Sequence, residues 1–367
     1  MKKFSKNILI AVCSFIVCLT FAASGCADGN DGKPENGGIV SYVSQQTEVY
    51  SSTAEVVEAV ADTVVEISTE TVTTQWGMQY IVSGAGSGVI VGKNEENNLY
   101  YIVTNNHVID GAKEISVTTR SGEKYAASLV AADDSADIAV IAVTTEVNLK
   151  IAVWGDSDRL KIGEDLIAIG NPLGSLGGTV TKGILSAKGR SITVGNYAMT
   201  LLQTDTAISP GNSGGGLFNM RGQLIGVVNA KTTDEEIEGI CFAIPANTAR
   251  SVYGDLVQYG YINGRATLGI MVEQLTFRNS HTIVCVTDAG NSPDGTFMRY
   301  DGIYSVNGKR ISTILEFNVA LSEINVGDSV EIEVYRGTAS QGILGSVNIS
   351  FASELTKFSV NAVQYGA

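Results

Sequence analysis

The chain has 367 residues, with 24 Lys and Arg against 38 Asp and Glu, so its formal net charge is −14. This acidic balance argues against nucleic acid as a partner and against purely electrostatic attachment to an anionic bilayer, because both need positive charge. After residue 26 the only cysteines are Cys241 and Cys285, too few for a disulfide framework. Both lie in apolar runs and are predicted to be small buried hydrophobic residues.

Residues 1–25 are predicted to be a lipoprotein signal peptide. Lys2, Lys3 and Lys6 precede an apolar run from Ile8 to Ala23, which is the build of a secretory signal. The run ends in "AASGC", which resembles the lipobox of bacterial lipoproteins, in which the cysteine is lipidated; here that residue is Cys26. The alternative is an uncleaved transmembrane anchor. Both interpretations put the chain outside the cytoplasm of a bacterium and tie it to a membrane, and cleavage leaves a net charge of −17.

Composition divides the remainder into three parts. Residues 26–51 are polar and rich in Gly, Asn and Ser, as in a flexible tether. Residues 52–260 contain many short β-type runs separated by turn signals, which predicts a β-barrel or β-sandwich domain. Residues 265–355 combine strand patterns with a helix-like stretch, "TILEFNVALSEI", which predicts a small α+β module.

Two helices are expected in the β domain. The first is "STAEVVEAVAD", with Ser52 or Thr53 as its N-cap. The second runs from Asn247, as its N-cap, to Gly260, which closes it.

The stretch "SPGNSGGGLF", Ser209–Phe218, surrounds Ser213 with glycines. A serine nucleophile needs a base, and one of the two histidines, His107, lies where a β-run ends. Asp137 enters an apolar run directly, where a buried carboxylate needs a donor such as a histidine N–H. The alternative for these residues is an ordinary polar turn and, around Asp133 and Asp134, a solvated acidic turn or part of a calcium site.

The glycines fit an oxyanion hole made by the backbone N–H groups of Gly211 and Ser213, because side chains would obstruct the required turn. "GNSGG" also fits the nucleophile elbow of α/β-hydrolases, but that fold needs its histidine after the serine. His281, in the separate module, is the only candidate there. The order His107, Asp137, Ser213 instead matches the chymotrypsin arrangement.

Long motifs resemble the HtrA (DegP/DegS-like) family of serine proteases: "TNNHVI", "DIAVIAV", "IGNPLGSLGGTVTKGILSAKGR", "LLQTDTAISPGNSGGGLFN" and "GQLIGVVNA". The resemblance implies a mainly β fold, with a chymotrypsin-like double six-stranded β-barrel followed by a small α+β PDZ-like domain. It also implies quality control of extracytoplasmic proteins without ATP, metal or other cofactor.

The same resemblance assigns site residues. His107 is the base, Asp137 its orienter, Ser213 the nucleophile, and Ile208 helps floor an apolar S1 pocket. "TLGI" resembles the carboxylate-binding loop of a PDZ domain, which would assign C-terminal peptide ligands to Leu268, Gly269 and Ile270.

The expected function is a serine endopeptidase that cleaves unfolded or misfolded polypeptides through an acyl-enzyme. The alternative is a catalytically silent scaffold or chaperone that binds exposed peptide segments. Family members form trimers, and the short segment Thr73–Tyr80 predicts a simple homotrimer rather than a larger cage.

Overall fold

The structure is a computed structural model that describes residues 40–41, 49–75, 78–170, 178–208, 211–230, 239–277, 281–290, 296–341 and 347–364. The predicted signal peptide and Cys26 lie outside the described residues. Across the ranges just given, no helix combines the length and apolarity needed to cross a membrane.

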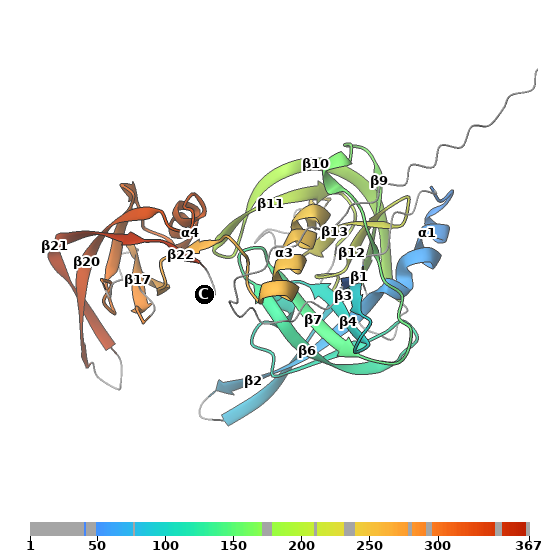
Figure 1. Ribbon diagram of the computed structural model, residues 1–367, viewed down its shortest axis with the longest axis horizontal. Helices are drawn as coiled ribbons and strands as arrows, with labels where there is room; N and C mark the ends of the chain where they lie inside the picture. The colour runs from blue at the N-terminus through green and yellow to red at the C-terminus, as the bar shows by residue number, and fades with distance from the viewer. Residues whose placement is uncertain are drawn as a thin grey trace, which may run out of the picture. The chain divides into compact units, whose positions relative to one another are not determined.

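The first half of the β domain is a closed barrel (Figure 1). Its sheet order is β3-β2-β5-β6-β7-β4, and β3 also pairs with β4, which closes it. The strands are alternating or fully apolar, and closing the sheet into a barrel buries their apolar side chains. Strand β7, for example, is buried from Ile138 to Val143. The strands are β2 (Val64–Gln75), β3 (Met78–Asn94), β4 (Leu99–Thr104), β5 (Glu114–Thr118), β6 (Lys124–Asp133) and β7 (Ile138–Thr144).

A short strand, β1 (Val40–Ser41), adds to this barrel by pairing with Asn94 and Lys93 of β3. Val40 and Ser41 lie inside the predicted tether of residues 26–51. Val40 and Ser41 therefore have regular backbone pairing, which composition did not reveal because only two residues take part.

The second half of the β domain repeats this architecture. Its described strands follow the order β12-β9-β10-β11-β14-β13-β8, and β12 also pairs with β13. The strands are β8 (Val153–Trp154), β9 (Asp165–Gly170), β10 (Thr179–Val194), β11 (Tyr197–Thr204), β12 (Gly216–Asn219), β13 (Gln223–Asn229) and β14 (Cys241–Pro245). The predicted mainly β, double-barrel fold is confirmed.

One hydrophobic core joins the two barrels. Val89 and Ile138 of the first barrel share it with Phe218 and Leu224 of the second. The seam between the barrels is thus packed as tightly as their interiors, and residues from both can form one site.

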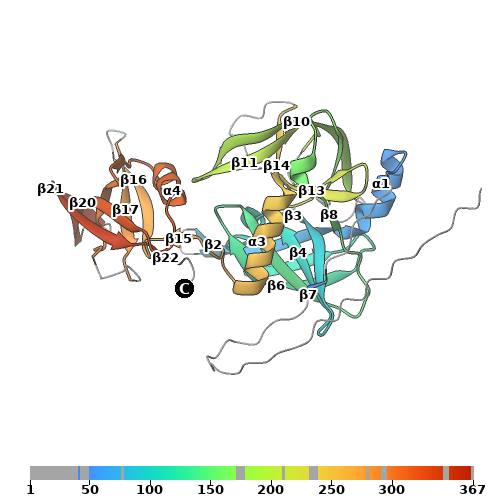
Figure 2. The ribbon, with the colours of Figure 1, turned by 45° about the horizontal axis from the view of Figure 1, so that its top comes forward.

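Three helices and two 3-10 turns complete the described part of the β domain: α1 (Thr53–Val60), η1 (Ala61–Thr63), α2 (Asn106–Ile109), η2 (Ser157–Arg159) and α3 (Ala246–Tyr259). Ser52 caps α1, since its side chain accepts a hydrogen bond from the Glu55 N–H. Helix α3 contacts β6 and β7 of the first barrel and β13 and β14 of the second (Figures 1 and 2).

The predicted cap of α3 is wrong. The helix begins after Pro245 without a side-chain cap, whereas Asn247 donates its Nδ2 to Asp156 Oδ1 at 2.9 Å. This partner lies 91 residues away, so the local pattern could not indicate it. Gly260 does end the helix, with a left-handed φ of 78°.

The C-terminal module is an α+β unit. A sheet of order β16-β17-β18-β20-β21 faces helix α4 (Ile314–Ser322). Thr313 and Glu316 form a capping box at the N-terminus of this helix. The described strands of the module are β15 (Ala266–Thr267), β16 (Met271–Thr276), β17 (Thr282–Asp288), β18 (Gly302–Val306), β19 (Lys309–Arg310), β20 (Ser329–Gln341), β21 (Val347–Asn361) and β22 (Val363–Gln364). Because β22 pairs with β15, residues beyond 355 also belong to this module.

The two cysteines after residue 26 are free thiols, Cys241 half-buried and Cys285 buried. Burial raises the pKa of the Cys285 thiol to about 11. At pH 8 only about 0.1 % of this thiol is ionised, and the thiolate is the reactive form.

We therefore expect iodoacetamide at pH 8 to modify Cys285 about 200-fold more slowly in the native protein than in urea, where the thiol pKa returns to about 8.5. Peptide mapping by mass spectrometry separates Cys285 from the other four cysteines. Equal rates in the two conditions would contradict the burial of this side chain.

Candidate active site

His107 lies in α2 (Asn106–Ile109), a single turn directly after β4. The strand ends at Thr104, and Asn105 begins the turn in an extended conformation. Asn105 is buried, and its Nδ2 donates to the Asp137 carbonyl at 3.0 Å. The backbone on either side of the imidazole is therefore fixed by buried hydrogen bonds.

Asp137 makes two hydrogen-bonding contacts with His107. Its Oδ2 lies 2.7 Å from His107 Nδ1, and its Oδ1 accepts the His107 backbone N–H at 2.9 Å. The side chains are 6 % and 20 % exposed, respectively. A carboxylate held in this way fixes the tautomer with the proton on Nδ1 and leaves Nε2 as the acceptor.

Asp137 has a φ of 50°, a left-handed conformation that few non-glycine residues adopt. The turn before it supports this geometry, because Asp133 accepts the Ala136 N–H at 3.0 Å and the Ser135 hydroxyl. Asp133 also forms an ion pair with Arg265. It is only 3 % exposed, so the interpretation of Asp133 as a solvated turn residue is wrong.

Asn229, at the end of β13, is a site residue that the sequence did not reveal. Its Nδ2 donates to Asp137 Oδ2 at 2.9 Å, and the residue is buried. The two positions are 92 residues apart and lie in different barrels. Only its place at the end of an apolar strand could have drawn attention to it.

Ser213 lies in the second barrel, just before β12, and is 7 % exposed. Its carbonyl accepts the Ser87 N–H of β3 at 2.8 Å, and the following Gly214 N–H donates to Val228 at 2.9 Å. Thr104, the last residue of β4, donates its hydroxyl to the Ser87 carbonyl at 2.7 Å. The serine loop therefore packs on the strand end that leads into His107.

Gly211 has a φ of 96°, and its carbonyl accepts the Ser87 hydroxyl at 2.7 Å. Neither its N–H nor that of Ser213 donates to another described residue. Ser209 and Pro210 lie outside the described residues.

Gly214 is required by space as well as by its φ of 81°. A Cβ at this position would lie 2.2 Å from the Ser87 carbonyl oxygen and 2.3 Å from Thr104 Oγ1. We expect Gly214→Ala to destabilise the protein by about 3 kcal/mol, from overpacking and left-handed strain together.

The control is Gly163→Ala, which has a similar φ of 91° and nothing within 4 Å of the added Cβ. It should cost only about 1 kcal/mol in a urea titration, because strain acts alone. Equal losses in the two variants would show that the serine loop is not packed against the first barrel.

The remaining predicted residues belong to the second barrel and the C-terminal module. Ile208 is partly buried and packs on the core of the second barrel, which contains Leu217 and Val228. In the C-terminal module, Leu268 is buried, and the Gly269 N–H donates to Thr267 Oγ1 at 3.2 Å. Ile270 packs against the module's core.

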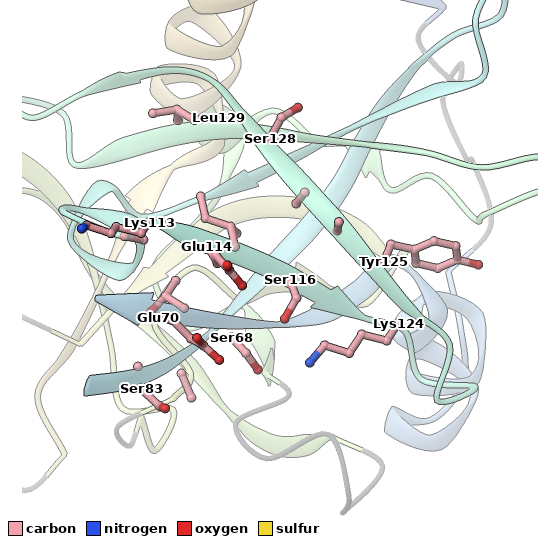
Figure 3. A pocket seen from close by; sticks show the side chains of 17 residues that line it. Ser68, Glu70, Ser83, Lys113, Glu114, Ser116, Lys124, Tyr125, Ser128 and Leu129 are labelled. Atoms are coloured by element: carbon pink, nitrogen blue, oxygen red, sulfur yellow. The ribbon is translucent and has the colours of Figure 1, made fainter. Parts of the chain in front are cut away.

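A separate hollow of about 930 Å³ lies on the first barrel and includes neither His107 nor Ser213 (Figure 3). Strands β2, β3, β5 and β6 form it, and Ser68, Ser116 and Ser128 are among its small polar lining residues. Glu70 and Glu114 lie directly opposite each other in it.

Residues 86–227 match the family model of the trypsin-like peptidase domain. The serine protease Do-like HtrA of Bacillus subtilis is 36 % identical over 279 residues, which are 69 % of this chain and 61 % of the relative. The crystal structure of the serine endoprotease from Yersinia pestis is 30 % identical, with a TM-score of 0.51 over 86 % of this chain and 99 % of that one. The chain belongs to the HtrA family of serine proteases.

Other HtrA relatives agree. The periplasmic serine endoprotease DegP of Escherichia coli is 37 % identical over 272 residues, 71 % of this chain and 56 % of DegP. The solved structure of the HtrA-type protease AlgW with decapeptide is 28 % identical, with a TM-score of 0.55 over 86 % of this chain and 99 % of AlgW. The present chain thus spans about 61 % of the length of the B. subtilis relative and 56 % of that of the E. coli relative.

Proposed function

We propose that this chain is a serine endopeptidase in which His107, Asp137 and Ser213 act together. The observation that carries the proposal is the 2.7 Å contact between His107 Nδ1 and Asp137 Oδ2, beside a serine loop bonded to the same barrel. A binding protein would not need a buried carboxylate to orient this imidazole. Membership of the HtrA family supports the same chemistry.

The mechanism follows from the geometry. His107 Nε2 takes the proton of Ser213 Oγ as the oxygen attacks the scissile carbonyl. The N–H groups of Gly211 and Ser213 stabilise the oxyanion. His107 then gives the proton to the leaving amine, the C-terminal half departs, and water hydrolyses the acyl-enzyme by the same steps in reverse order.

Asn229 is a positioning residue in this scheme, because it acts through Asp137. We expect Asn229→Ala to lower kcat by about 10- to 150-fold, since a hydrogen bond to a charged group contributes about 1.5–3 kcal/mol. KM should stay unchanged, because the side chain contacts the carboxylate and not the substrate. A change in KM with constant kcat would contradict this role.

We propose unfolded or misfolded polypeptides as substrates, with an apolar residue before the scissile bond seated near Ile208. The position of Ile208 on the second-barrel core supports this specificity. C-terminal peptides would bind the module at Leu268, Gly269 and Ile270. Strand β16, which follows this loop, is the first strand of its sheet order and faces α4, an arrangement that supports an added peptide strand.

The proposed location is extracytoplasmic, with a lipid on Cys26 as the membrane anchor and a homotrimer as the assembly. The N-terminal sequence pattern supports the anchor. The E. coli and Salmonella typhimurium relatives are named periplasmic serine endoproteases, which supports the compartment.

The test is the digestion of unfolded casein by the purified chain, without ATP and with EDTA present. We expect new casein N-termini, counted by mass spectrometry, to accumulate with time, and a fluorophosphonate to stop their formation. Casein that is retained by the protein but stays intact would instead establish the scaffold function.

A further inference from the structure

Ser87 of β3 is a fully buried polar residue that takes no part in the proton transfers proposed above. It belongs to the first barrel, yet two of its hydrogen bonds reach the loop of the second barrel that carries Ser213. Its hydroxyl donates to the Gly211 carbonyl at 2.7 Å, and its N–H donates to the Ser213 carbonyl at 2.8 Å. One residue of the first barrel thus holds both ends of the segment from Gly211 to Ser213.

This segment carries the two proposed oxyanion donors. The N–H of Ser213 lies between the two carbonyls that Ser87 holds, and the N–H of Gly211 lies directly before the first of them. Gly211 has a φ of 96°, and a glycine can adopt several other backbone conformations at little steric cost. A hydrogen bond to its carbonyl therefore selects one conformation of the loop, and with it the direction of the adjoining N–H groups.

The backbone that presents the Ser87 hydroxyl is itself closely packed. The Ser87 carbonyl accepts the hydroxyl of Thr104, the last residue of β4, at 2.7 Å. The neighbouring Gly86 allows a close approach to α2, because a Cβ there would lie 2.5 Å from Cγ1 of Val108, the residue after His107. Ser87 is therefore held against the same strand end and turn that place the imidazole.

Packing between the barrels does not require a hydroxyl at this position. Apolar residues such as Val89 and Phe218 already join the barrels in one core. A buried hydroxyl costs free energy of desolvation unless it is hydrogen-bonded, so an alanine would serve packing alone. What serine adds is the bond that directs the Gly211 carbonyl.

We propose that Ser87 is a positioning residue for the oxyanion hole. Its hydroxyl selects the loop conformation in which the N–H groups of Gly211 and Ser213 converge on one point. This inference rests on the proposed peptidase function. Ser87 acts through the backbone of the loop and not through the proton transfers of His107.

The test variant is Ser87→Ala, which removes the hydroxyl and keeps the backbone N–H that bonds to Ser213. We expect kcat on a casein-derived peptide to fall about 10-fold, since a neutral hydrogen bond is worth at most about this factor. Removing an oxyanion donor altogether typically costs more, about 10²–10³-fold. KM should stay unchanged, because the oxyanion forms only after the substrate has bound.

Two further measurements separate this role from a merely structural one. A small fluorophosphonate reacts with Ser213 without occupying peptide subsites, and its phosphoryl oxygen needs the oxyanion donors. We expect its second-order labelling rate to fall by the same factor of about 10 as kcat. The pH at which kcat/KM is half-maximal should not move, because the variant leaves His107 and Asp137 in place.

The matched control is Ser83→Ala, which changes an exposed serine of the same strand. Both kcat and the labelling rate should match those of the unmodified chain. A second variant, Ser87→Cys, has a side chain of similar size but a weaker donor, and its rates should lie between those of serine and alanine. Melting temperatures of all variants are recorded, so that unfolding is not mistaken for a loss of positioning.

Three outcomes would overturn the proposal while leaving the peptidase function intact. The first is a folded Ser87→Ala chain with unchanged kcat and labelling rate. The second is a higher KM with an unchanged labelling rate, which would assign Ser87 to substrate binding. The third is a shifted pH midpoint, which would show that the residue acts on His107.

Failure of the peptidase function gives a different result, since the unmodified chain would neither cleave the peptide nor react with the probe. The loop is then tested by hydrogen exchange, because its amides are protected by bonds such as that from Gly214 to Val228. Faster exchange in Gly211–Phe218 of Ser87→Ala than of Ser83→Ala would support the positioning of the loop. Equal exchange in the two variants would refute it.

Discussion

Ser213→Ala is expected to lower kcat on casein-derived peptides by about 10⁶-fold, the loss typical of removing the nucleophile of a serine protease. The fold should survive. The contact that anchors Ser213 to the first barrel runs from the Ser87 N–H to the Ser213 carbonyl, and alanine keeps that carbonyl. The residual rate comes from the oxyanion donors and from substrate binding alone.

The control for this variant is Ser191→Ala, which changes an exposed serine on β10 of the same barrel. Its kcat should match that of the unmodified chain. If Ser213→Ala kept more than about a tenth of the activity with an unchanged melting temperature, another residue would have to be the nucleophile.

Asp137→Asn is expected to lower kcat by about 10⁴-fold. Three donors converge on the Asp137 carboxylate: the His107 N–H on Oδ1, and His107 Nδ1 and Asn229 Nδ2 on Oδ2. An amide has only one oxygen, so its NH₂ group must face at least one of these donors. If it faces Nδ1, the imidazole takes the other tautomer, and Nε2 can no longer accept the Ser213 proton.

The matched control is Asp134→Asn, three residues earlier in the same turn. Asp134 is exposed, and its carboxylate accepts a long hydrogen bond, 3.3 Å, from Asn106 Nδ2. Steady-state kinetics should show a change of less than about 2-fold. Similar losses in both variants would mean that negative charge near the site matters, rather than the orientation of His107.

The sequence pattern predicted the elements that depend on local signals. The Ser52 cap, the Thr313 helix start and the Gly260 helix end each involve residues within one turn of one another. The double barrel followed from strand patterns together with the family resemblance. The pairing of His107 with Asp137 was expected from residue types and chain order, and the structure gives it a distance.

Other contacts were missed because they join residues far apart in the chain. Asn229 donates to Asp137, 92 residues away in the chain. Asn247 does not cap its helix as expected, because its side chain donates to a partner 91 residues away. Asp133 looked like a surface residue because an acidic turn is normally solvated, but Arg265 covers it from the start of the C-terminal module.

The most direct test of the central claim is the site of covalent labelling by a fluorophosphonate. This probe reacts with a serine only when a base activates it and an oxyanion hole receives the phosphoryl oxygen. The full chain is labelled, digested and mapped by mass spectrometry, and His107→Ala is treated in parallel. We predict one adduct, on Ser213, that is absent from His107→Ala. A folded chain that carries no adduct, or an adduct on another serine, would contradict the account.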